Sequence, residues 1–304
     1  MTKPDNVTAW ADFWANRPSE GEARCMPNAH REITEVQSAV WHGFARALEK
    51  GARVLDLATG DGIVLKAMRE VRPDLRLTGV DSSPTLPAAP PGITLRPGAA
   101  MEALPFADGA FDAVTSQFGY EYGDTEAAAR EVARILAPGG SLRFIVHRSD
   151  GPIVAHNLPR RDALRWALAP GGYVAKARGL IAARRIAALP TPPAFRAAPQ
   201  EAQSLFPNQS VGAEFLEALF RTLEMGRGKP VRESLEVIDT LEKKARNEIA
   251  RIETLERAAR DAAGIEALCA ELRGAGFDTE TPEPLIERST QRPFAWLIAG
   301  RQPG

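Results

Sequence analysis

Apolar residues between about residue 51 and residue 150 follow two alternating patterns. Short apolar runs predict five strands, at 53–57, 75–80, 93–95, 111–116 and 141–146. Apolar residues at helical spacing predict helices at about 63–71 and 126–136. Largely apolar strands that alternate with helices indicate a parallel sheet that is covered on both faces. Little room is left for a helix between the second and third strands, because this segment contains Pro84, Pro87, Pro90 and Pro91.

The alternation stops at about residue 152. From there to about 262 no strand pattern is visible. A long helix is predicted from about Val231 to Ala262, because an apolar residue recurs at every third or fourth position from Val231 up to Ala259. A helix at 265–273 and strands at 283–288 and 294–300 follow. The pattern predicts an α/β, Rossmann-like fold with a seven-stranded, mostly parallel sheet and a large helical insertion after strand five. The predicted domains are a helical segment at 1–50, a Rossmann-like domain at 51–150 and 264–304, and the insertion at 151–263.

Composition excludes several classes of protein. The chain has 304 residues, of which 44% are hydrophobic and 25% charged, as in ordinary folded proteins. The net charge of −1 gives the whole chain no attraction to nucleic acid or to an anionic membrane. Two cysteines, Cys25 and Cys269, are too few for a disulfide framework or a zinc site, and the apolar pattern around Cys269 predicts a buried residue. With neither a signal peptide nor a membrane span in the pattern, we expect a cytoplasmic protein.

The strongest chemical signal lies where the first strand ends. The run from Val54 to Gly62 places two glycines in a tight turn before a helix, where the backbone can approach a ligand. Asp81 ends the next strand, where a carboxylate can accept hydrogen bonds from both hydroxyls of a ribose. These features predict a site for a nucleoside cofactor. Asp61 would repel a pyrophosphate, whereas an acidic loop suits the amino group and the sulfonium of S-adenosylmethionine.

These residues resemble the motifs of class I S-adenosylmethionine-dependent methyltransferases. VLDLATGDG (54–62) resembles their first motif, and Asp81 in TGVDSSP resembles the second. MEALPF (101–106) and DGAFD (108–112) resemble the type 11 branch, LAPGG (136–140) resembles the turn before strand five, and GAGF (274–277) resembles the turn before the final hairpin. The resemblance covers about residues 50–148 and 264–300. It implies the class I fold, S-adenosylmethionine as cofactor and S-adenosylhomocysteine as product, and it is almost silent about the substrate.

The resemblance also implies which residues bind the cofactor. Asp56, Ala58 and Gly60 would line the methionine end, Asp81 would hold the ribose, Ser82, Ala100 and Met101 would flank the adenine, and Gln117 and Phe118 would face the cofactor. The other candidates are Thr59, Asp61, Gly62, Ser83, Glu102 and, in the N-terminal segment that would act as a lid with Trp10 and Phe13, Trp14. Two positions depart from the family pattern: Ala58 replaces the first motif glycine, and Ala100 stands where an acid often contacts the adenine amino group.

Candidates for catalysis follow strands four and five, because ligands of parallel sheets bind beyond the carboxyl ends of strands. Tyr120, Glu121 and Tyr122 could orient an acceptor, or the tyrosines could pack. His147 could take a proton from an acceptor hydroxyl or amine, or could be a neutral residue bonded within its loop. Methyl transfer to a good nucleophile can also proceed by alignment alone. No cluster of His, Asp and Glu has the spacing of metal ligands.

The insertion leaves two questions open. Basic residues dominate between His156 and Ala198. They either bind an anionic partner or form a solvated face that acids elsewhere in the insertion balance, and we favour the second interpretation. The long helix either packs within a substrate cap or pairs two copies in a homodimer. We expect methyl transfer to the O, N or C atom of a small molecule, as in secondary metabolism. The alternatives are an RNA or peptide acceptor on the basic insertion, with nucleic acid less favoured, and a scaffold protein that binds S-adenosylmethionine without catalysis.

Overall fold

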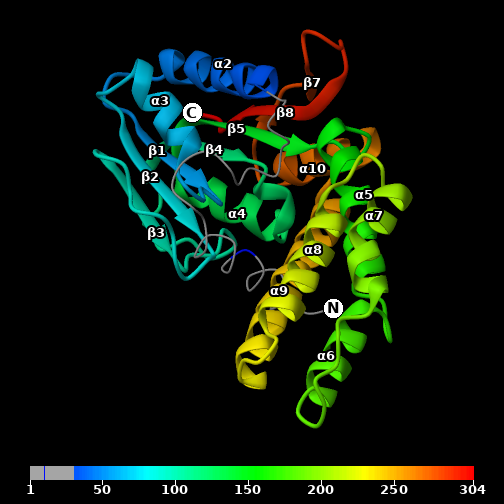
Figure 1. Cartoon of the computed structure of the whole chain (residues 1–304). Helices are drawn as coiled ribbons and strands as arrows, with labels where there is room; N and C mark the ends of the chain where they lie inside the picture. The colour runs from blue at the N-terminus through cyan, green and yellow to red at the C-terminus, as the bar shows by residue number, and fades with distance from the viewer. Residues whose placement is uncertain (1–9, 11–30) are drawn as a thin grey trace. The chain divides into compact units, whose positions relative to one another are not determined.

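The computed structural model describes residue 10 and residues 31–304 of the chain (Figure 1). Within these residues the chain forms two compact units, which divide after Val154 and after Glu253. The first unit contains the sheet, and the second is helical. N-terminal candidates Phe13, Trp14 and Cys25 lie outside the described residues.

The first unit is built on an eight-stranded sheet. Its order is β3-β2-β1-β4-β5-β8-β6, and β7 also pairs with β8. Neighbours among the first five strands run parallel, whereas β8 is antiparallel to β5, β6 and β7. The strands are β1 Arg53–Leu57, β2 Arg76–Asp81, β3 Ile93–Pro97, β4 Phe111–Gln117, β5 Leu136–His147, β6 Asp278–Thr279, β7 Glu283–Ile286 and β8 Pro293–Arg301.

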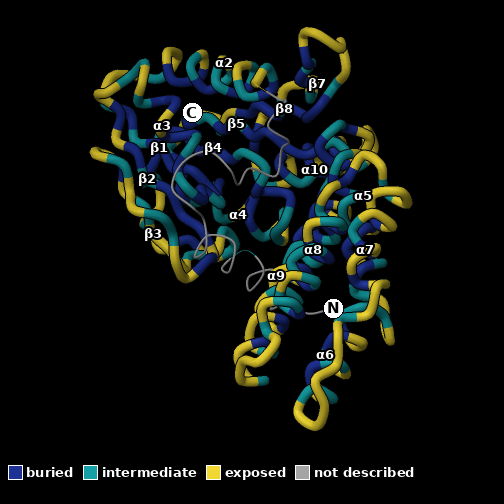
Figure 2. Tube along the Cα trace, in the orientation of Figure 1, coloured by how far each residue is buried: buried dark blue, intermediate teal, exposed yellow. Residues whose placement is uncertain are grey.

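Helices cover both faces of this sheet, as Figure 1 shows. α2 (Arg31–Ala47) and α3 (Ile63–Val71) pack on the face that carries Val54. α4 (Thr125–Ile135) and α10 (Ala262–Gly274) pack on the face that carries Leu55. Neighbouring residues of β1 therefore enter opposite cores, as the alternation of side chains along a strand requires. The buried strands lie between exposed outer helix faces in Figure 2. The predicted α/β, Rossmann-like fold is confirmed.

Details of the sheet differ from the sequence-based expectation. Eight strands are present where seven were predicted, because the two residues of β6 are too short to show a periodic pattern. β5 begins at Leu136, directly after α4, although the Pro138-Gly139-Gly140 turn suggested a later start. Gly139 has a φ of 73°, and the pairing with β4 shifts register there, so the strand starts through a bulge. No helix lies between β2 and β3, as the prolines predicted.

A short backbone contact ends the long helix earlier than predicted. α9 spans Val231–Ala258, four residues short of the expected end at 262. The Arg260 backbone N–H donates to the His147 carbonyl at 2.8 Å, and the Ser149 N–H donates to the Arg260 carbonyl at 3.1 Å. The chain thus leaves its helix to pair with the end of β5. Cys269 on α10 is fully buried, as predicted.

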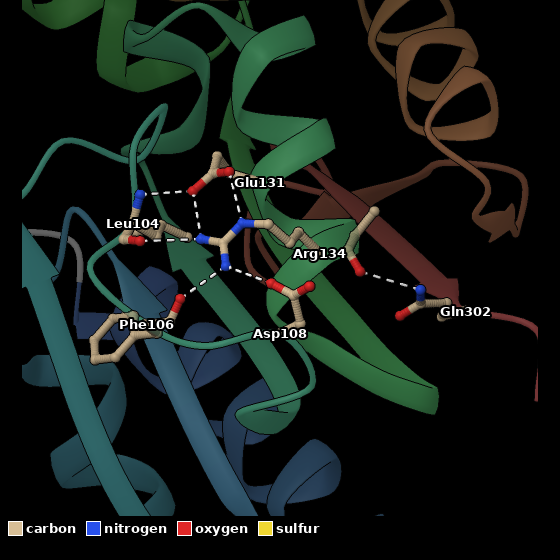
Figure 3. A network of polar contacts seen from close by, with 7 residues as sticks. Leu104, Phe106, Asp108, Glu131, Arg134 and Gln302 are labelled. Carbon is tan, nitrogen blue, oxygen red and sulfur yellow. Dashed lines mark hydrogen bonds and ion pairs between the residues drawn. The ribbon is translucent and has the colours of Figure 1, made fainter.

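Arg134 on α4 holds the loop between β3 and β4 (Figure 3). Its guanidinium donates to the carbonyls of Phe106 at 2.7 Å and Leu104 at 3.0 Å, and it pairs with Glu131 and Asp108. Glu131 also accepts the Leu104 N–H at 2.7 Å. These bonds satisfy backbone groups of a loop that has no sheet partner. They fix the loop in which the Leu104-Pro105-Phe106 turn lies.

The second unit contains α6 (Tyr173–Ala183), α7 (Pro193–Leu205) and α8 (Val211–Met225), with most of α5 (Pro152–Ala167) and α9. Its apolar core includes Phe195, Leu216, Leu219 and Ile238. The first part of the α9 apolar stripe, from Leu235 to Ile249, packs in this core, so a homodimer could not use those residues as its pairing surface.

Acidic residues of α9 pair with the basic residues that precede them in the chain. Arg160 meets Glu248 at 2.9 Å, and Arg165 meets Glu253 at 2.7 Å. Arg178 contacts Asp239 at 2.7 Å and Glu242 at 2.8 Å. For Arg160, Arg165 and Arg178, this agrees with the interpretation that acids elsewhere in the insertion balance its basic stretch.

Candidate functional site

The loop between β1 and α3 is built from left-handed backbone conformations. Ala58, Gly60 and Gly62 have φ values of 51°, 53° and 72°. The Thr59 N–H donates to the Val80 carbonyl at 2.9 Å, and Gly62 caps α3. Glycine adopts such angles without strain, whereas the Cβ of an alanine adds about 1–2 kcal/mol. The motif therefore closes a tight turn at the end of β1, and Ala58 is its strained member.

Asp81 ties the ends of β1 and β2 together. One carboxylate oxygen accepts the Gly60 N–H at 3.0 Å, and the other accepts the Ser83 N–H at 2.9 Å. Burial raises the pKa of Asp81 above its usual range, and these two hydrogen bonds oppose that rise. Each oxygen still has a lone pair, because a carboxylate has about four acceptor positions. The carboxyl group is thus held at the position where the sequence predicted ribose binding.

Asp56 is fully buried in β1, directly before the last residue of that strand, Leu57. Burial raises its pKa to about 7, and the nearby Asp81 and Asp61 carboxylates add to the rise. The Thr115 hydroxyl on β4 donates a hydrogen bond to Asp56 at 2.8 Å, and this bond opposes the rise in the pKa of Asp56. Three carboxyl groups therefore gather around one turn, which favours a ligand with positive charge.

The loops after β1 and β4 meet at van der Waals distance. A Cβ added at Gly119 would lie 2.4 Å from the Cβ of Ala58, so this contact requires glycine. Phe118, the preceding residue, has a left-handed φ of 57°. Non-glycine residues in this conformation are concentrated at ligand sites, where the surrounding structure holds them in place. The acidic turn and this close contact fit a compact cofactor with an amino group, a sulfonium and a ribose.

Glu121 and His147 form a buried pair beside these loops. One Glu121 oxygen contacts the imidazole Nδ1 at 2.8 Å and accepts the His147 backbone N–H at 3.0 Å. Phe118 stacks on the imidazole at 4.0 Å between ring centroids, and Tyr122 meets its edge at 5.9 Å. Trp10 in turn meets the Tyr122 ring at 6.0 Å. A carboxylate at Nδ1 directs Nε2 away from Glu121, and such a histidine can accept a proton there.

Comparisons with known proteins agree with this geometry. Residues 55–144 match the family model described as "Methyltransferase domain". The chain is 44% identical over 105 residues to the demethylmenaquinone methyltransferase of Thermus thermophilus, a match that covers 32% of this chain and 48% of that protein. It is 37% identical over 114 residues to the ubiquinone/menaquinone biosynthesis C-methyltransferase UbiE of Geobacter sulfurreducens, covering 33% and 44%. A solved S-adenosylmethionine-dependent methyltransferase of Mesorhizobium loti has 17% identity and a TM-score of 0.43, over 88% of this chain and all of that one.

Residues 55–144 therefore carry a methyltransferase domain, and this part of the chain is similar to class I methyltransferases. The cofactor of those enzymes is S-adenosylmethionine, as the glycine-rich turn predicted. The chain spans less than half of each of the two curated relatives, so their acceptors do not carry over directly. His147 lies just beyond the matched residues 55–144.

Several residues predicted to line a class I methyltransferase site are found where expected along the chain. Asp56, Ala58, Thr59, Gly60, Asp61 and Gly62 lie at the end of β1 and in its turn, and Asp81, Ser82 and Ser83 lie at the end of β2 and just beyond. Ala100, Met101 and Glu102 follow β3, in the loop that Arg134 anchors. The Glu102 carboxylate accepts the Asp124 N–H at 3.0 Å, which holds this loop against the start of α4. Their contacts with the cofactor remain a prediction.

The structure gives three other candidates partners within the protein. Tyr120, which was predicted either to contact substrate or to pack, packs: it is fully buried against Phe144, and its hydroxyl donates to the Thr125 carbonyl at 2.7 Å. Glu121 is also buried, and its carboxylate contacts His147. Gln117 was predicted to face the cofactor. Its amide oxygen accepts the Trp41 indole N–H of α2 at 2.6 Å, and the cofactor contact stays a prediction.

Two residues of the site carried no signal in the sequence. Thr115 supports Asp56 across the β1–β4 pair, and Arg260 joins His147 through its backbone. Thr115 lies opposite Asp56 in register, which only the paired strands reveal. Among the described residues no cluster of His, Cys, Asp and Glu could hold a metal, and no helix could span a membrane.

Proposed function

We propose that this chain transfers a methyl group from S-adenosylmethionine to a small-molecule acceptor, with His147 as the proton acceptor. The observation that carries the proposal is the Glu121–His147 contact at 2.8 Å in the same sheet edge as the Asp81–Gly60 turn. Strands β1, β4 and β5 are neighbours, and their carboxyl ends meet at one edge. Cofactor and acceptor sites at one edge of a parallel sheet are the usual arrangement in doubly wound folds.

Each residue has a distinct part in this proposal. Asp81 would accept hydrogen bonds from the ribose, and Asp56 and Asp61 would surround the amino acid end with negative charge. S-adenosylmethionine supplies a methyl group on a positively charged sulfur. His147 would remove the proton of the acceptor at Nε2, and Glu121 would hold the imidazole and favour its charged form after proton transfer. Phe118 would fix the imidazole plane by stacking.

The acceptor in this proposal has an ionisable hydroxyl at or next to the atom that is methylated. A histidine base serves such a group, because the oxygen becomes a stronger nucleophile, or activates a neighbouring ring carbon, when its proton leaves. The relatives named for demethylmenaquinone and for ubiquinone/menaquinone biosynthesis support an aromatic, quinol-like acceptor. The helical insertion stays our candidate for the element that selects it. Arg160, Arg165 and Arg178 of the insertion pair with acids of α9, so these three residues do not favour an RNA or peptide acceptor.

Calorimetry with S-adenosylmethionine and S-adenosylhomocysteine tests the cofactor half of the proposal. Both ligands should bind, and Asp81→Asn should weaken both by about tenfold or more through loss of a charged acceptor. Asp278→Asn changes an exposed acid at β6 and is the matched control, which should leave affinity unchanged. Binding of neither ligand by the unaltered protein would contradict the proposal and favour a scaffold role.

Methyl transfer from labelled S-adenosylmethionine across a panel of hydroquinones, phenols and amines tests the second half. With any acceptor found, His147→Ala should lower kcat by about 10²–10⁴-fold. The calorimetric affinity for S-adenosylmethionine should not change. Equal turnover in the variant would remove His147 from the mechanism while leaving cofactor binding in place.

A further inference from the structure

Large apolar side chains are exposed at one end of the helical unit. Among the described residues, five large hydrophobic side chains are exposed, and all of them lie in this unit: Ile186, Leu189, Leu205, Met225 and Val237. Ile186 and Leu189 lie in the connection that follows α6, and Met225 is the last residue of α8. We call residues 184–190 and 225–229 the helical tip. Ile186 is 93% exposed and Met225 is 68% exposed, and residues 185–190 form a continuous exposed run (Figure 2).

The exposed side chains are carried by an ordered frame. The Arg184 guanidinium donates to the Leu189 carbonyl at 2.9 Å, to the Leu223 carbonyl at 2.6 Å and to the Thr191 hydroxyl at 2.8 Å. These bonds join the connection after α6 to the end of α8. The two connections together enclose a surface hollow of about 580 Å³. The Arg184 side chain therefore fixes the segment that carries the exposed apolar side chains of Ile186 and Leu189.

Positive charge surrounds the exposed apolar residues. Arg184, Arg185, Arg227 and Lys229 line the hollow, and the described residues that line it include no acid. Arg227 pairs with Glu224 at 2.8 Å. In the part of the chain that the structure describes, the side chains of Arg185 and Lys229 contact no hydrogen-bond or ion-pair partner. Two other exposed arginines of this unit, Arg221 and Arg232, pair with acids one helical turn away, and Arg196 lies over the Phe220 ring. Free cations thus coincide with exposed apolar side chains at the tip.

We propose that the helical tip docks on the surface of an anionic lipid bilayer. Ile186, Leu189 and Met225 would enter the boundary between headgroups and acyl chains, and Arg185 and Lys229 would contact lipid phosphates. Interfacial segments combine these two kinds of residue, because apolar burial and attraction to anionic lipids add. The net charge of −1 is no obstacle, because surface attraction acts on charges within a Debye length of the membrane.

The charge of the tip decides between this occupant and others. A second tip would bring the same cations together, and like charges repel. A protein partner would need both an acidic rim and a depression for Ile186, whose side chain projects almost completely into solvent. A bilayer offers phosphates at its surface and an apolar layer beneath them, so one layered partner meets both requirements.

Cosedimentation of the full chain with vesicles tests the proposal without any methyl transfer. Vesicles of phosphatidylcholine with phosphatidylglycerol should bind the protein, and binding should fall with added salt. Vesicles of phosphatidylcholine alone should bind it much more weakly. Equal binding to both vesicles, or to neither, would overturn the proposal, and inorganic phosphate at the lipid phosphate concentration should not displace the protein.

Matched variants locate the contact. Ile186→Ser should weaken vesicle binding by about tenfold or more, whereas Leu205→Ser, an exposed leucine at the end of α7, should not. Arg185→Glu combined with Lys229→Glu should abolish binding, whereas Arg221→Glu should leave it intact. Equal loss in tip and control variants would overturn the assignment. A change in sedimentation velocity with Ile186→Ser, together with no vesicle binding, would instead show contact between copies of the chain.

Discussion

A single carboxylate oxygen of Glu121 contacts His147 twice, at the backbone N–H at 3.0 Å and at the imidazole Nδ1 at 2.8 Å. Within the described residues, the second oxygen of Glu121 is buried and has no hydrogen-bond partner. A buried, unsatisfied acceptor costs about 1–3 kcal/mol, so the structure tolerates a cost at this position. Such a cost is understandable where a full negative charge has a task, and we infer that the task is to support a charged His147.

Glu121→Gln tests this role. The amide oxygen can still accept from Nδ1, so the imidazole keeps its place, but the negative charge is lost. We expect kcat to fall by about 10–100-fold while the affinity for S-adenosylmethionine is unchanged.

Glu131→Gln provides the matched control for that experiment. Glu131 is another partly buried carboxylate, but it binds Arg134 and the Leu104 N–H away from His147. Its replacement should lower stability and leave kcat unchanged at a temperature where the variant is folded. If both variants lowered kcat equally, Glu121 would have only a structural role.

Asp56→Asn should show a pH-dependent gain in stability. The folded-state pKa of Asp56 is raised from 3.8 to about 7 by burial, so the folded protein retains a proton that the unfolded chain releases. Stability is therefore lost as the pH rises from about 4 to about 7, and the loss amounts to a few kcal/mol. Asparagine removes this titration, and its oxygen can still accept from Thr115. Urea unfolding at pH 5 and at pH 8 should show a larger advantage of the variant at pH 8.

Asp112→Asn should change stability with pH in the opposite direction, and it is the control for Asp56→Asn. Hydrogen bonds from Arg53 hold the pKa of Asp112 below its usual range. Its contribution to stability is present above pH 4 and is lost as the pH falls through the folded-state pKa. The asparagine variant should therefore be less stable than the unaltered protein at pH 8, and the difference should shrink in acid. Parallel curves for both variants would contradict the assigned titrations.

Much of the fold followed from local pattern, because buried parallel strands and amphipathic helices leave strong periodic signals. The turn at Gly60 and the acid at Asp81 were also visible, since both depend on residue type at a strand end. The contacts of the Tyr120 and Gln117 side chains could not be predicted. Gln117 ends β4 and Tyr120 follows it, but Tyr120 packs into the core and Gln117 bonds to Trp41. The sequence spacing does not specify which side of the strand end each side chain takes.

Contacts between residues far apart in the sequence could not be predicted either. Glu121 was predicted to meet substrate because it follows a strand, and only the neighbouring strand end revealed His147 as its partner. The basic stretch of the insertion could be interpreted in two ways until α9 supplied its acids, whose pairing partners lie 88 residues away for Arg160 and Arg165. Charge balance over such separations depends on how helices pack, which composition does not contain.

Arg134→Ala should weaken cofactor binding from a distance. Arg134 holds the carbonyls of Leu104 and Phe106, and the same loop carries Ala100 and Met101, which the family resemblance places at the adenine. Without the guanidinium the loop loses its backbone partners and becomes more mobile. We expect calorimetric affinity for S-adenosylmethionine to fall by about three- to tenfold and the thermal midpoint to drop by several degrees. Arg130→Ala removes an exposed pair with Glu126 on the same helix and should do neither.

The contact between Ala58 and Gly119 allows a double-mutant test of the cofactor turn. Gly119→Ala alone would place a methyl group 2.4 Å from the Ala58 Cβ and should cost about 1–3 kcal/mol of stability. Ala58→Gly alone should stabilise the protein by about 1 kcal/mol, because Ala58 has a φ of 51° and glycine adopts that angle freely.

In the double variant the nearest remaining atoms are the Ser116 Oγ at 3.3 Å and the Ala58 carbonyl oxygen at 3.5 Å, so the cost of Gly119→Ala should largely disappear. The coupling free energy between the two sites should then be about 1–2 kcal/mol in urea unfolding. Ala47→Gly, in the exposed last turn of α2, is the control and should lower stability by about 0.5–1 kcal/mol. Additive effects at Ala58 and Gly119 would mean that the two loops do not touch in solution. The tight cofactor turn would then have to be held by its bonds to β2, from the Gly60 N–H to Asp81 and from the Thr59 N–H to the Val80 carbonyl.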